Sequence, residues 1–189
     1  MDKIIFHPEF VTATIYEWHP LLTRTEFKQI VIDSLQFLVK EGRIILYGYC
    51  IMNTHIHLIW QVKGKWLSSN VRRDFFKYTA HQFKRKLEKY YPFELFLYKA
   101  TQGDRTYQFW ERHTLCVDVF TPKVFTQKLD YIHDNPVSAG ICLLPEEYEF
   151  SSAAYYFNGK DLYGFLTHYI MVKKMCFLDK SRDWSVTPT

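Results

Sequence analysis

The sequence predicts an α+β domain of the ferredoxin-like (RRM-like) split βαβ type, with an antiparallel sheet. Two observations predict this class. Segments with the two-residue period of strands alternate with segments that have the helical period, and their order is strand, helix, strand, strand, helix, strand, followed by one more helix. At 189 residues, with 48% hydrophobic and 23% charged residues, the chain fits one globular domain with an appended segment.

The first half of the domain is predicted to contain three strands and one helix. Residues 10–18 mix β-branched and aromatic residues and predict a strand, which a His-Pro pair ends. A helix is expected from residue 23 or 25 to about residue 40, with its apolar residues on one face. The nearly continuous apolar run at 43–52 is typical of a central strand. A second central strand, which carries two histidines, follows it at 55–62.

The second half begins with a long helix that Ser68 or Ser69 can cap and that reaches about Tyr90. Its apolar residues recur at helical spacing and predict one buried stripe, made of Phe76, Ala80, Phe83, Leu87 and Tyr90. Residues 91–107 contain Pro and Gly and predict a loop, whereas the alternation at 109–120 predicts a further strand.

A short helix after this strand carries a tyrosine and an asparagine on one face. Its start is a Thr-Pro pair at 121–122, a capping threonine followed by a proline at the first helical position. Because Pro136 disfavours helical geometry at the residue before it, we expect the helix to end near Asp134 or Asn135. Tyr131 and Asn135 are four residues apart, so both point away from the apolar stripe. The alternative is a rim tyrosine with a capping asparagine.

Two histidines stand on one face of the second central strand. Side chains alternate along a strand, so His55 and His57 project to one side and Ile56 and Leu58 to the other. Imidazole is a common metal ligand, and a pair with this spacing can hold one divalent ion. The alternative is a pair of polar residues on a solvent face. Because the apolar set should pack on the long helices, the tyrosine helix must cover the histidine face for a site to form.

Together, the histidine strand and the tyrosine helix resemble the single-tyrosine HUH transposases, in particular the REP-associated tyrosine transposases. The resemblance runs from about Phe10 to about Tyr156. Six blocks carry it in the family's order, and they are FVTATIYEWHPLL, YGYCIMNTHIHLIW, RRDFFKYTAHQF, FWERHTLCVDVF, YIHDNPVSAGI and PEEYEFSSAAYY. The chain departs from many relatives at 53–54, where they have Pro-Asn, at Ser138, where they have a basic residue, and at Asn135, where the wider group has glutamine.

The resemblance implies a DNA-cutting and DNA-joining enzyme. Tyr131 would be the nucleophile that forms a 5′-phosphotyrosine and leaves a free 3′-hydroxyl. His55, His57 and Asn135 would hold a divalent ion, Mg²⁺ or Mn²⁺, although Asn135 can also serve only as a helix cap. The family acts on single-stranded DNA next to hairpins, so DNA with hairpin or palindromic repeats is the expected partner. Both homodimers and monomers occur among relatives.

Basic residues follow the histidine strand. The net charge of +4 is modest, but the long helix carries many Lys and Arg residues. Because this helix begins soon after the histidine strand ends, we expect Arg72, Arg73 and Lys77 to contact DNA phosphates, the alternative being a solvated helix surface. His133 faces away from Tyr131 on its helix, which favours packing or a phosphate contact over a ligand role.

Residues 1–142 are expected to form the HUH transposase domain, and residues 143–189 a helical, aromatic-rich extension packed on it. The four cysteines are widely spaced without a Cys-x-x-Cys pair, which favours reduced thiols over a structural zinc site. No stretch has the length of a membrane span or the pattern of a signal peptide, so we expect a cytoplasmic protein with no membrane partner.

Three other classes of protein are alternatives to the enzyme. A phosphoesterase with paired His-x-Ser/Thr motifs is disfavoured, because none of the eight histidines has Ser or Thr two residues on. An RNA-binding module of the same topology would stack bases on aromatic residues of its open face, which leaves the histidines without a role. An inactive or domesticated relative that binds DNA without cutting it is the alternative that the sequence leaves open.

Overall fold

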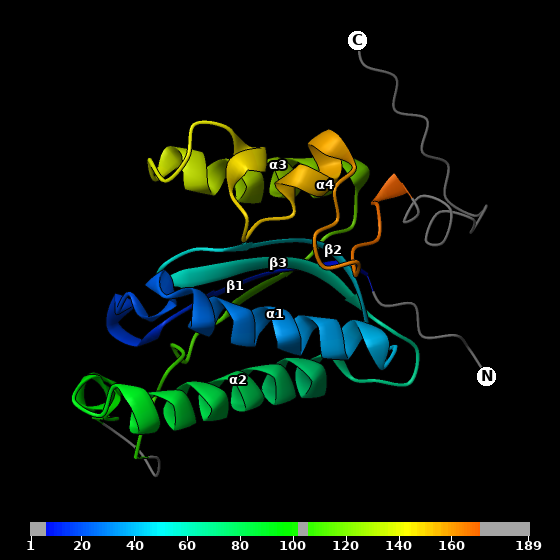
Figure 1. The fold of residues 1–189 in the computed structure, drawn as a ribbon. Coiled ribbons are helices and arrows are strands. Elements are labelled where there is room, and N and C mark those ends of the chain that lie inside the picture. Colours follow the sequence, from blue (N-terminus) through cyan, green and yellow to red (C-terminus); the bar gives the residue numbers. More distant parts are fainter. Residues whose placement is uncertain (1–6, 102–105, 171–189) are drawn as a thin grey trace.

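The core of the molecule is a four-stranded antiparallel sheet with the strand order β2-β3-β1-β4 (Figure 1). The computed structural model describes residues 7–101 and 106–170. Its strands are β1 (Glu9–Thr14), β2 (Ile44–Ile51), β3 (His55–Val62) and β4 (Leu115–Asp118). With the first and third strands at the centre, this is the order of the split βαβ arrangement. The predicted fold class is therefore confirmed.

Helices cover both faces of the sheet (Figure 1). One layer consists of α1 (Thr25–Lys40) and α2 (Ser68–Tyr90), and the other of α3 (Pro122–Ser138) and α4 (Ala153–Asn158). Short 3-10 turns join the elements, and they are η1 (Tyr16–Trp18), η2 (Leu21–Thr23), η3 (Glu94–Tyr98) and η4 (Pro145–Glu147). The helix that carries Tyr131 thus lies on the face opposite to the two long helices.

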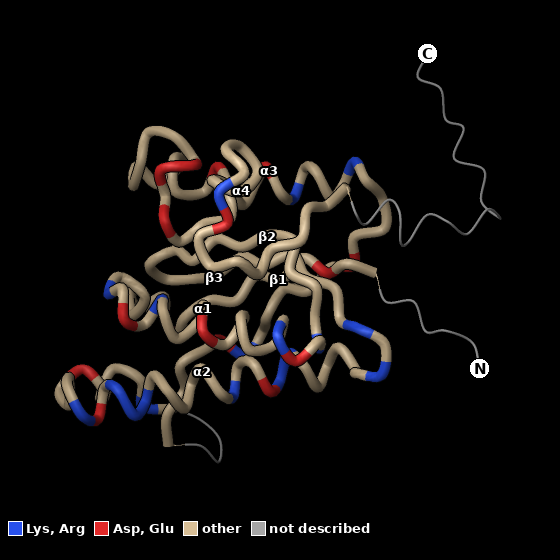
Figure 2. Tube along the Cα trace, turned by 45° about the vertical axis from the view of Figure 1, so that its right-hand side comes forward, with Lys and Arg blue, Asp and Glu red and all other residues tan. Residues whose placement is uncertain are grey.

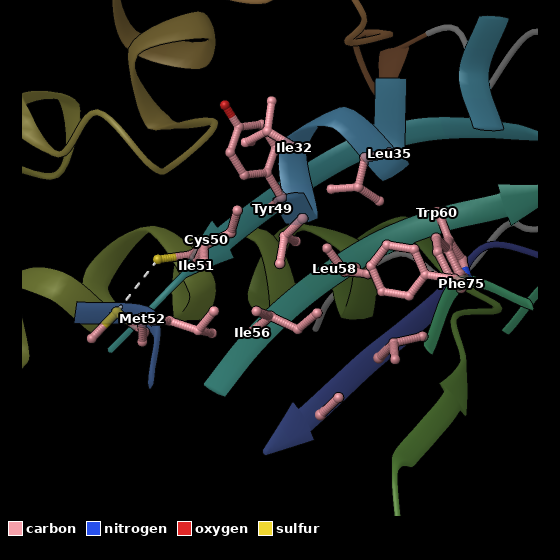
Figure 3. Packing of buried hydrophobic residues seen from close by; sticks show 14 of the residues in the cluster. Ile32, Leu35, Tyr49, Cys50, Ile51, Met52, Ile56, Leu58, Trp60 and Phe75 are labelled. Carbon is pink, nitrogen blue, oxygen red and sulfur yellow. Dashed lines mark hydrogen bonds between the residues drawn. The ribbon is translucent and has the colours of Figure 1, made fainter. Parts of the chain in front are cut away.

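The alternation along β3 decides which side chains meet which layer. Ile56, Leu58 and Trp60 are fully buried, and the Trp60 ring packs edge-on against Phe75 of α2 at 5.6 Å between centroids (Figure 3). Burial of each such side chain contributes about 1.5–3 kcal/mol. This apolar set fixes the register of β3, because a shift by one residue would turn the histidines into the core.

The predicted strand at 109–120 is only partly a strand. β4 contains four residues, whereas residues 106–114 lie along α2 and keep only an isolated bridge, from Trp110 to Ile15, to the end of β1. Trp110 anchors this segment, since its indole Nε1 donates to Thr79 Oγ1 at 3.0 Å and its ring contacts Phe76 at 5.3 Å between centroids. β1 also ends earlier than predicted, at Thr14, because the chain turns there into η1.

The buried stripe of α2 differs by one residue from the predicted one in its first half. The residues that are buried are Val71, Phe75, Thr79, Phe83 and Leu87. Phe76 and Ala80 are only half-buried, and Tyr90 is 58% exposed. The reason is that α2 packs against α1, the sheet and residues 106–114, and the helical period alone does not separate these adjacent contact faces.

α3 begins as predicted but continues through Pro136. Thr121 Oγ1 accepts a hydrogen bond from the Val124 backbone N–H at 3.2 Å, so the threonine is the cap. Pro136 removes one backbone donor, yet the Ala139 N–H still donates to the Asn135 carbonyl at 2.9 Å. The prediction that the helix ends at 134 or 135 was wrong, and Asn135 lies inside the helix rather than capping it.

Side chains of α3 come close to β2 at Gly48. A Cβ at this position would lie 2.8 Å from Leu129 Cδ1 and 3.1 Å from Ile132 Cδ1, two side chains of the buried face of α3. Any other residue would push those side chains away, because a contact under 3.0 Å is shorter than packed carbon atoms tolerate. Gly48 therefore leaves room on β2 for the ends of these two side chains.

The described part of the C-terminal extension packs on the outer strand β2. Ser152 Oγ accepts from the Tyr49 N–H at 3.0 Å, the Tyr148 hydroxyl donates to the Ile51 carbonyl at 2.7 Å, and the Thr167 N–H donates to the Leu46 carbonyl at 2.9 Å. Residues 171–189, and with them Cys176, lie outside the described residues. Within the described ones, the cysteines are free thiols, and no helix combines the length and apolar character that crossing a bilayer requires.

Candidate active site

The predicted nucleophile and the two histidines meet between α3 and the sheet. The Tyr131 ring lies edge-on to the His57 ring with 5.2 Å between centroids, and the His55 and His57 rings are 4.8 Å apart. Tyr131 also contacts Phe10 of β1 at 6.1 Å. Because Tyr131 is 51% exposed, its ring reaches solvent while one edge touches the histidine. α3 therefore covers the histidine face, as the site requires.

His57 is held in a single orientation by β1. A hydrogen bond of 2.9 Å joins Thr12 Oγ1 to His57 Nδ1, and the two residues are cross-strand partners. The ring is only 2% exposed, and its Nε2 is buried without a hydrogen-bond partner in the described part of the chain. A buried polar atom without a partner costs about 1–3 kcal/mol. An orphaned imidazole nitrogen aimed into a polar site is suited to bind a metal ion.

His55 is oriented in the same way by its own neighbour. Thr54 Oγ1 lies 3.0 Å from His55 Nδ1. With the ring hydrogen on Nδ1, each imidazole donates to a threonine hydroxyl and keeps the lone pair of Nε2 for a ligand. In this tautomer, the two threonines orient the rings so that both Nε2 atoms can bind a ligand.

Asn135 brings an amide to both imidazoles. Its Nδ2 donates to the main-chain carbonyl of Tyr131 at 2.6 Å, so Oδ1 is the amide atom left for the histidines or an ion. No three His, Cys, Asp or Glu side chains gather into a metal cluster within residues 7–101 and 106–170. A metal ion here would therefore need the amide oxygen as its third protein ligand. Two nitrogens and one oxygen are a donor set that Mn²⁺ or Mg²⁺ accepts when water and phosphate oxygens complete it.

Both histidines favour the neutral form. Burial, with a smaller contribution from the neighbouring His55, lowers the pKa of His57 to about 3, although contact with the Asn135 amide works in the opposite direction. Burial also lowers the pKa of His55, again with Asn135 opposing. Because only the neutral imidazole has a lone pair to share, both rings are in the metal-binding form at neutral pH.

Two further residues at this site carry no signal of their own in the sequence. Lys128 Nζ lies 4.7 Å from the Phe10 ring centroid and 5.9 Å from that of Tyr131, so a positive charge stands beside the candidate nucleophile. Lys128 is three residues before Tyr131, and this i, i+3 spacing is the only sign that could have found it. Thr12 is identified only by the pairing of β1 with β3.

His133 does not offer a phosphate contact. It is 3% exposed, its Nε2 lies 2.8 Å from Ser152 Oγ, and its ring packs against Tyr156 of α4 at 5.4 Å. Burial lowers its pKa to about 4, so it is a neutral packing residue at pH 7. Of the two roles expected from the sequence, packing is the one that this geometry fits, and the DNA-contact role is corrected.

The expectation that the basic flank of α2 lies beside the histidines is also corrected. After β3 the chain crosses to the other face of the sheet, so α2 and α3 lie on opposite sides (Figure 1). The Arg72 guanidinium is held there by Glu9 Oε2 at 2.8 Å and by Ser68 Oγ at 2.6 Å. These contacts tie α2 to β1 and give Arg72 a structural role.

Arg73 and Lys77 are exposed and line a cavity of about 1020 Å³ between α2 and residues 106–114. Lys84 and Arg112 also line it, and Glu111 is the one carboxylate among the described lining residues. α2 contains seven Lys or Arg and two acidic residues, a formal charge of +5 against +4 for the whole chain. Figure 2 shows the basic positions repeated along α2. A phosphate contact at Arg73 and Lys77 stays a prediction.

The structure is similar to a solved structure of a REP-associated tyrosine transposase bound to a REP hairpin. The TM-score is 0.58 at 16% sequence identity, and the match covers 100% of this chain and 95% of that chain. The chain has the fold of this transposase. A suspected transposase from Deinococcus radiodurans matches with a TM-score of 0.49 and 12% identity, over 71% of this chain and 97% of that one. No protein-family model and no curated protein matches the chain.

Proposed function

We propose that this chain is a transposase-type enzyme of the single-tyrosine HUH group, which cuts and rejoins single-stranded DNA through Tyr131. The observation that carries the proposal is the 5.2 Å approach of the Tyr131 ring to His57, whose Nε2 is buried and without a partner in the described residues. The motif resemblance and the shared fold with a hairpin-bound tyrosine transposase support it. If the histidines were only polar residues on a solvent face and Tyr131 only a residue at the rim of its helix, their close contact would have no explanation.

The cutting step is a transesterification. The phenolic oxygen of Tyr131 attacks the scissile phosphorus while the bond from phosphorus to the 3′-oxygen breaks. The phenol proton passes to solvent, which reaches the half-exposed ring, and the departing 3′-oxygen takes up a proton from solvent. A phenol is a weak nucleophile at neutral pH. The ammonium group of Lys128, over the rings of Phe10 and Tyr131, provides positive charge next to the attacking group.

His55, His57 and Asn135 are the proposed metal ligands. The two Nε2 atoms are oriented by the threonine hydrogen bonds on Nδ1, and the Asn135 amide is fixed by its bond to the Tyr131 carbonyl. When bound, a divalent ion supplies Lewis-acid polarisation of the scissile phosphate and offsets the charge that builds up on it. Imidazole suits Mn²⁺ better than Mg²⁺, and both fit a site whose remaining ligands are oxygens.

Rejoining is the reverse reaction. The 3′-hydroxyl of a strand attacks the phosphotyrosine, the bond between phosphorus and the Tyr131 oxygen breaks, and the phenol takes up a proton. Because the ester keeps the energy of the broken phosphodiester, no nucleotide cofactor is needed. We propose single-stranded DNA with a hairpin or palindromic repeat as the substrate, since the structurally similar transposase is bound to a REP hairpin.

A covalent-adduct assay tests the proposal. The protein is incubated with labelled hairpin single strands from the DNA that flanks its own gene, with Mn²⁺ or Mg²⁺, and separated on a denaturing gel. We expect an adduct that EDTA prevents and that is lost in Tyr131→Phe. Tyr78→Phe is the matched control, because Tyr78 has the same 51% exposure but lies on α2.

The outcome that contradicts the enzyme is the absence of an adduct with every hairpin strand tested. Retained binding of those strands by the same protein would then identify the non-cutting DNA-binding relative. An adduct that persists in Tyr131→Phe would show that another residue is the nucleophile. Either result is distinguishable from misfolding by comparing the thermal unfolding of each variant with that of the wild type.

A further inference from the structure

A large aromatic side chain stands in solvent next to the proposed metal ligands. Trp18 is 63% exposed, and its ring contacts that of His55 at 5.8 Å between centroids with an interplanar angle of 66°. The exposed fraction shows that most of the indole surface is open to solvent. Neither metal binding nor the cutting step uses this ring, and leaving it in water forgoes the stabilisation that burial would bring.

The backbone that presents Trp18 is strained. Glu17 has φ 52° and Trp18 has φ 57°, and among the described residues these are the two non-glycine residues with a left-handed backbone. Two such residues in succession are unfavourable, and they persist only where the surroundings fix them. Here the Trp18 N–H donates to the Ile15 carbonyl at 2.9 Å, and the Ile15 N–H donates to the Thr54 carbonyl at 2.8 Å.

Glu111 completes this support from a distant part of the sequence. Its Oε1 accepts a hydrogen bond from the Glu17 backbone N–H at 2.7 Å. Its own N–H donates to the Thr14 carbonyl at 2.8 Å, and Thr14 pairs with His55 across the sheet. Glu111 also lines the basic cavity along α2. The strained turn therefore lies between that cavity and the histidine pair.

We propose that Trp18 is the platform on which an unpaired DNA base stacks beside the scissile phosphate, and that Glu111 is its positioning residue. The inference rests on the proposed function and deepens it. Every base has a π-face, so stacking on an aromatic ring tolerates any sequence. The faces of bases in a duplex are covered by their neighbours, so this platform selects single-stranded DNA.

Binding measurements in which the Trp18 side chain and the DNA bases are removed separately and together isolate the stacking contact. In a Tyr131→Phe background with Mn²⁺, fluorescence anisotropy compares the affinity for labelled oligothymidine with that for a matched strand of abasic sugars. We expect a preference for the bases that falls roughly tenfold in Trp18→Ala, the size of one lost base stack. Trp18→Phe should keep most of it. Affinity for the abasic strand should not change, because the phosphate contacts remain.

Controls separate stacking from general effects. Phe93→Ala removes an aromatic ring that is 87% exposed and far from the histidines in sequence, and it should leave the base preference unchanged. Glu111→Ala should lower the preference as Trp18→Ala does, whereas Glu111→Gln should restore it, because an amide oxygen still accepts from the Glu17 N–H.

The outcomes are distinguishable from those of the adduct assay. An unchanged base preference in Trp18→Ala overturns the inference and leaves the proposed cutting reaction standing. A base preference that depends on Trp18, in a protein that forms no adduct, supports stacking and overturns the enzyme. No single-strand binding by any variant overturns both.

Discussion

Two threonine hydroxyls orient the rings of the histidine pair. Each lies within 3.0 Å of a histidine Nδ1, and the hydrogen bond fixes the orientation of the ring. Where the hydroxyl accepts from Nδ1–H, it also keeps the lone pair of Nε2 for an ion. A histidine whose Nδ1 were free could rotate or carry its hydrogen on Nε2, where it would repel a cation. Such outer contacts commonly set the affinity of a metal site. Thr12 and Thr54 therefore belong to the proposed metal centre although neither would touch the ion.

Replacing Thr12 by valine tests this role. Valine has the shape of threonine but no hydroxyl, so His57 would lose the partner of Nδ1 while packing is kept. We expect Mn²⁺ affinity to fall by about tenfold to one hundredfold, the usual range for a lost outer contact. The measurement is a Mn²⁺ titration by calorimetry, together with adduct yield against Mn²⁺ concentration.

The control for that experiment is Thr126→Val. Thr126 is exposed on α3 and its hydroxyl bonds to a carbonyl of its own helix, so its loss should not affect the metal. Equal Mn²⁺ dependence in Thr12→Val and the wild type would show that the β1 hydroxyl does not support the site.

The site residues that could be predicted from the sequence are those that lie within a few positions of each other in the chain. His55 and His57 share a face because strands alternate, and Tyr131 and Asn135 share one because helices return after four residues. Thr12 is 45 residues from His57 in the chain, and Trp18 meets His55 only after β1 pairs with β3. These partners follow from the register of the sheet, which no local period encodes.

At the scale of elements, one carboxylate joins α2 to β1. Glu9 accepts hydrogen bonds from Ser68, Arg72 and Trp60, and its side chain is 9% exposed. Burial alone would raise the pKa of Glu9, but these three donors outweigh it and hold the pKa below its ordinary value. A carboxyl whose pKa is lower in the folded state stabilises the fold above its unfolded pKa.

Glu9→Gln should show this contribution as a function of pH. At pH 7 we expect the free energy of unfolding to fall by about 1–3 kcal/mol, since charged hydrogen bonds become neutral ones. The difference from the wild type should shrink as pH falls below about 4, where the wild-type carboxyl is protonated in the unfolded chain and then in the folded one. Urea unfolding of both proteins from pH 7 down to pH 3 measures it.

An exposed ion pair provides the comparison. Lys84 and Glu88 lie 3.3 Å apart on α2 with side chains 39% and 47% exposed, and such pairs contribute about 0.3–0.5 kcal/mol. Glu88→Gln should therefore change stability little at any pH. A Glu9→Gln difference that stays constant between pH 7 and pH 3 would contradict the role assigned to the Glu9 charge.

The elements that were predicted least well are those that pack against more than one neighbour. The period of α2 gave the helix and its length, but the first half of its buried stripe was placed on Phe76 and Ala80 instead of Phe75 and Thr79. The alternation at 109–120 resembled one strand, although Trp110 holds its first half on α2. In both cases a tertiary contact decides between adjacent residues, and local pattern is the same for either outcome.

At the scale of the molecule, the candidate active site and the basic helix α2 lie on opposite faces of the sheet. The histidines and Tyr131 lie between the sheet and α3, whereas the basic cavity lies along α2 in the other layer (Figure 1). Since α2 carries a formal charge of +5 and the whole chain +4, the rest of the chain is close to neutral. Glu111 lines the cavity and supports the turn that carries Trp18, so we expect a DNA strand that reaches both regions to pass this end of β1. The positively charged helix α2 would then bind the DNA backbone at a distance from the reacting phosphate.

Charge reversal along α2 tests whether this face binds DNA. Arg73→Glu and Lys77→Glu should weaken binding to all sequences alike, and each should reduce the slope of log affinity against log salt by about 0.7 if it removes one single-strand phosphate contact. Arg85→Glu is the matched control, because Arg85 is an exposed cation of the same helix outside the cavity. Arg72→Glu should instead lower thermal stability, since it places a second carboxylate against Glu9. If the slope of log affinity against log salt is the same in Arg73→Glu, Lys77→Glu and the wild type, DNA does not contact the cavity.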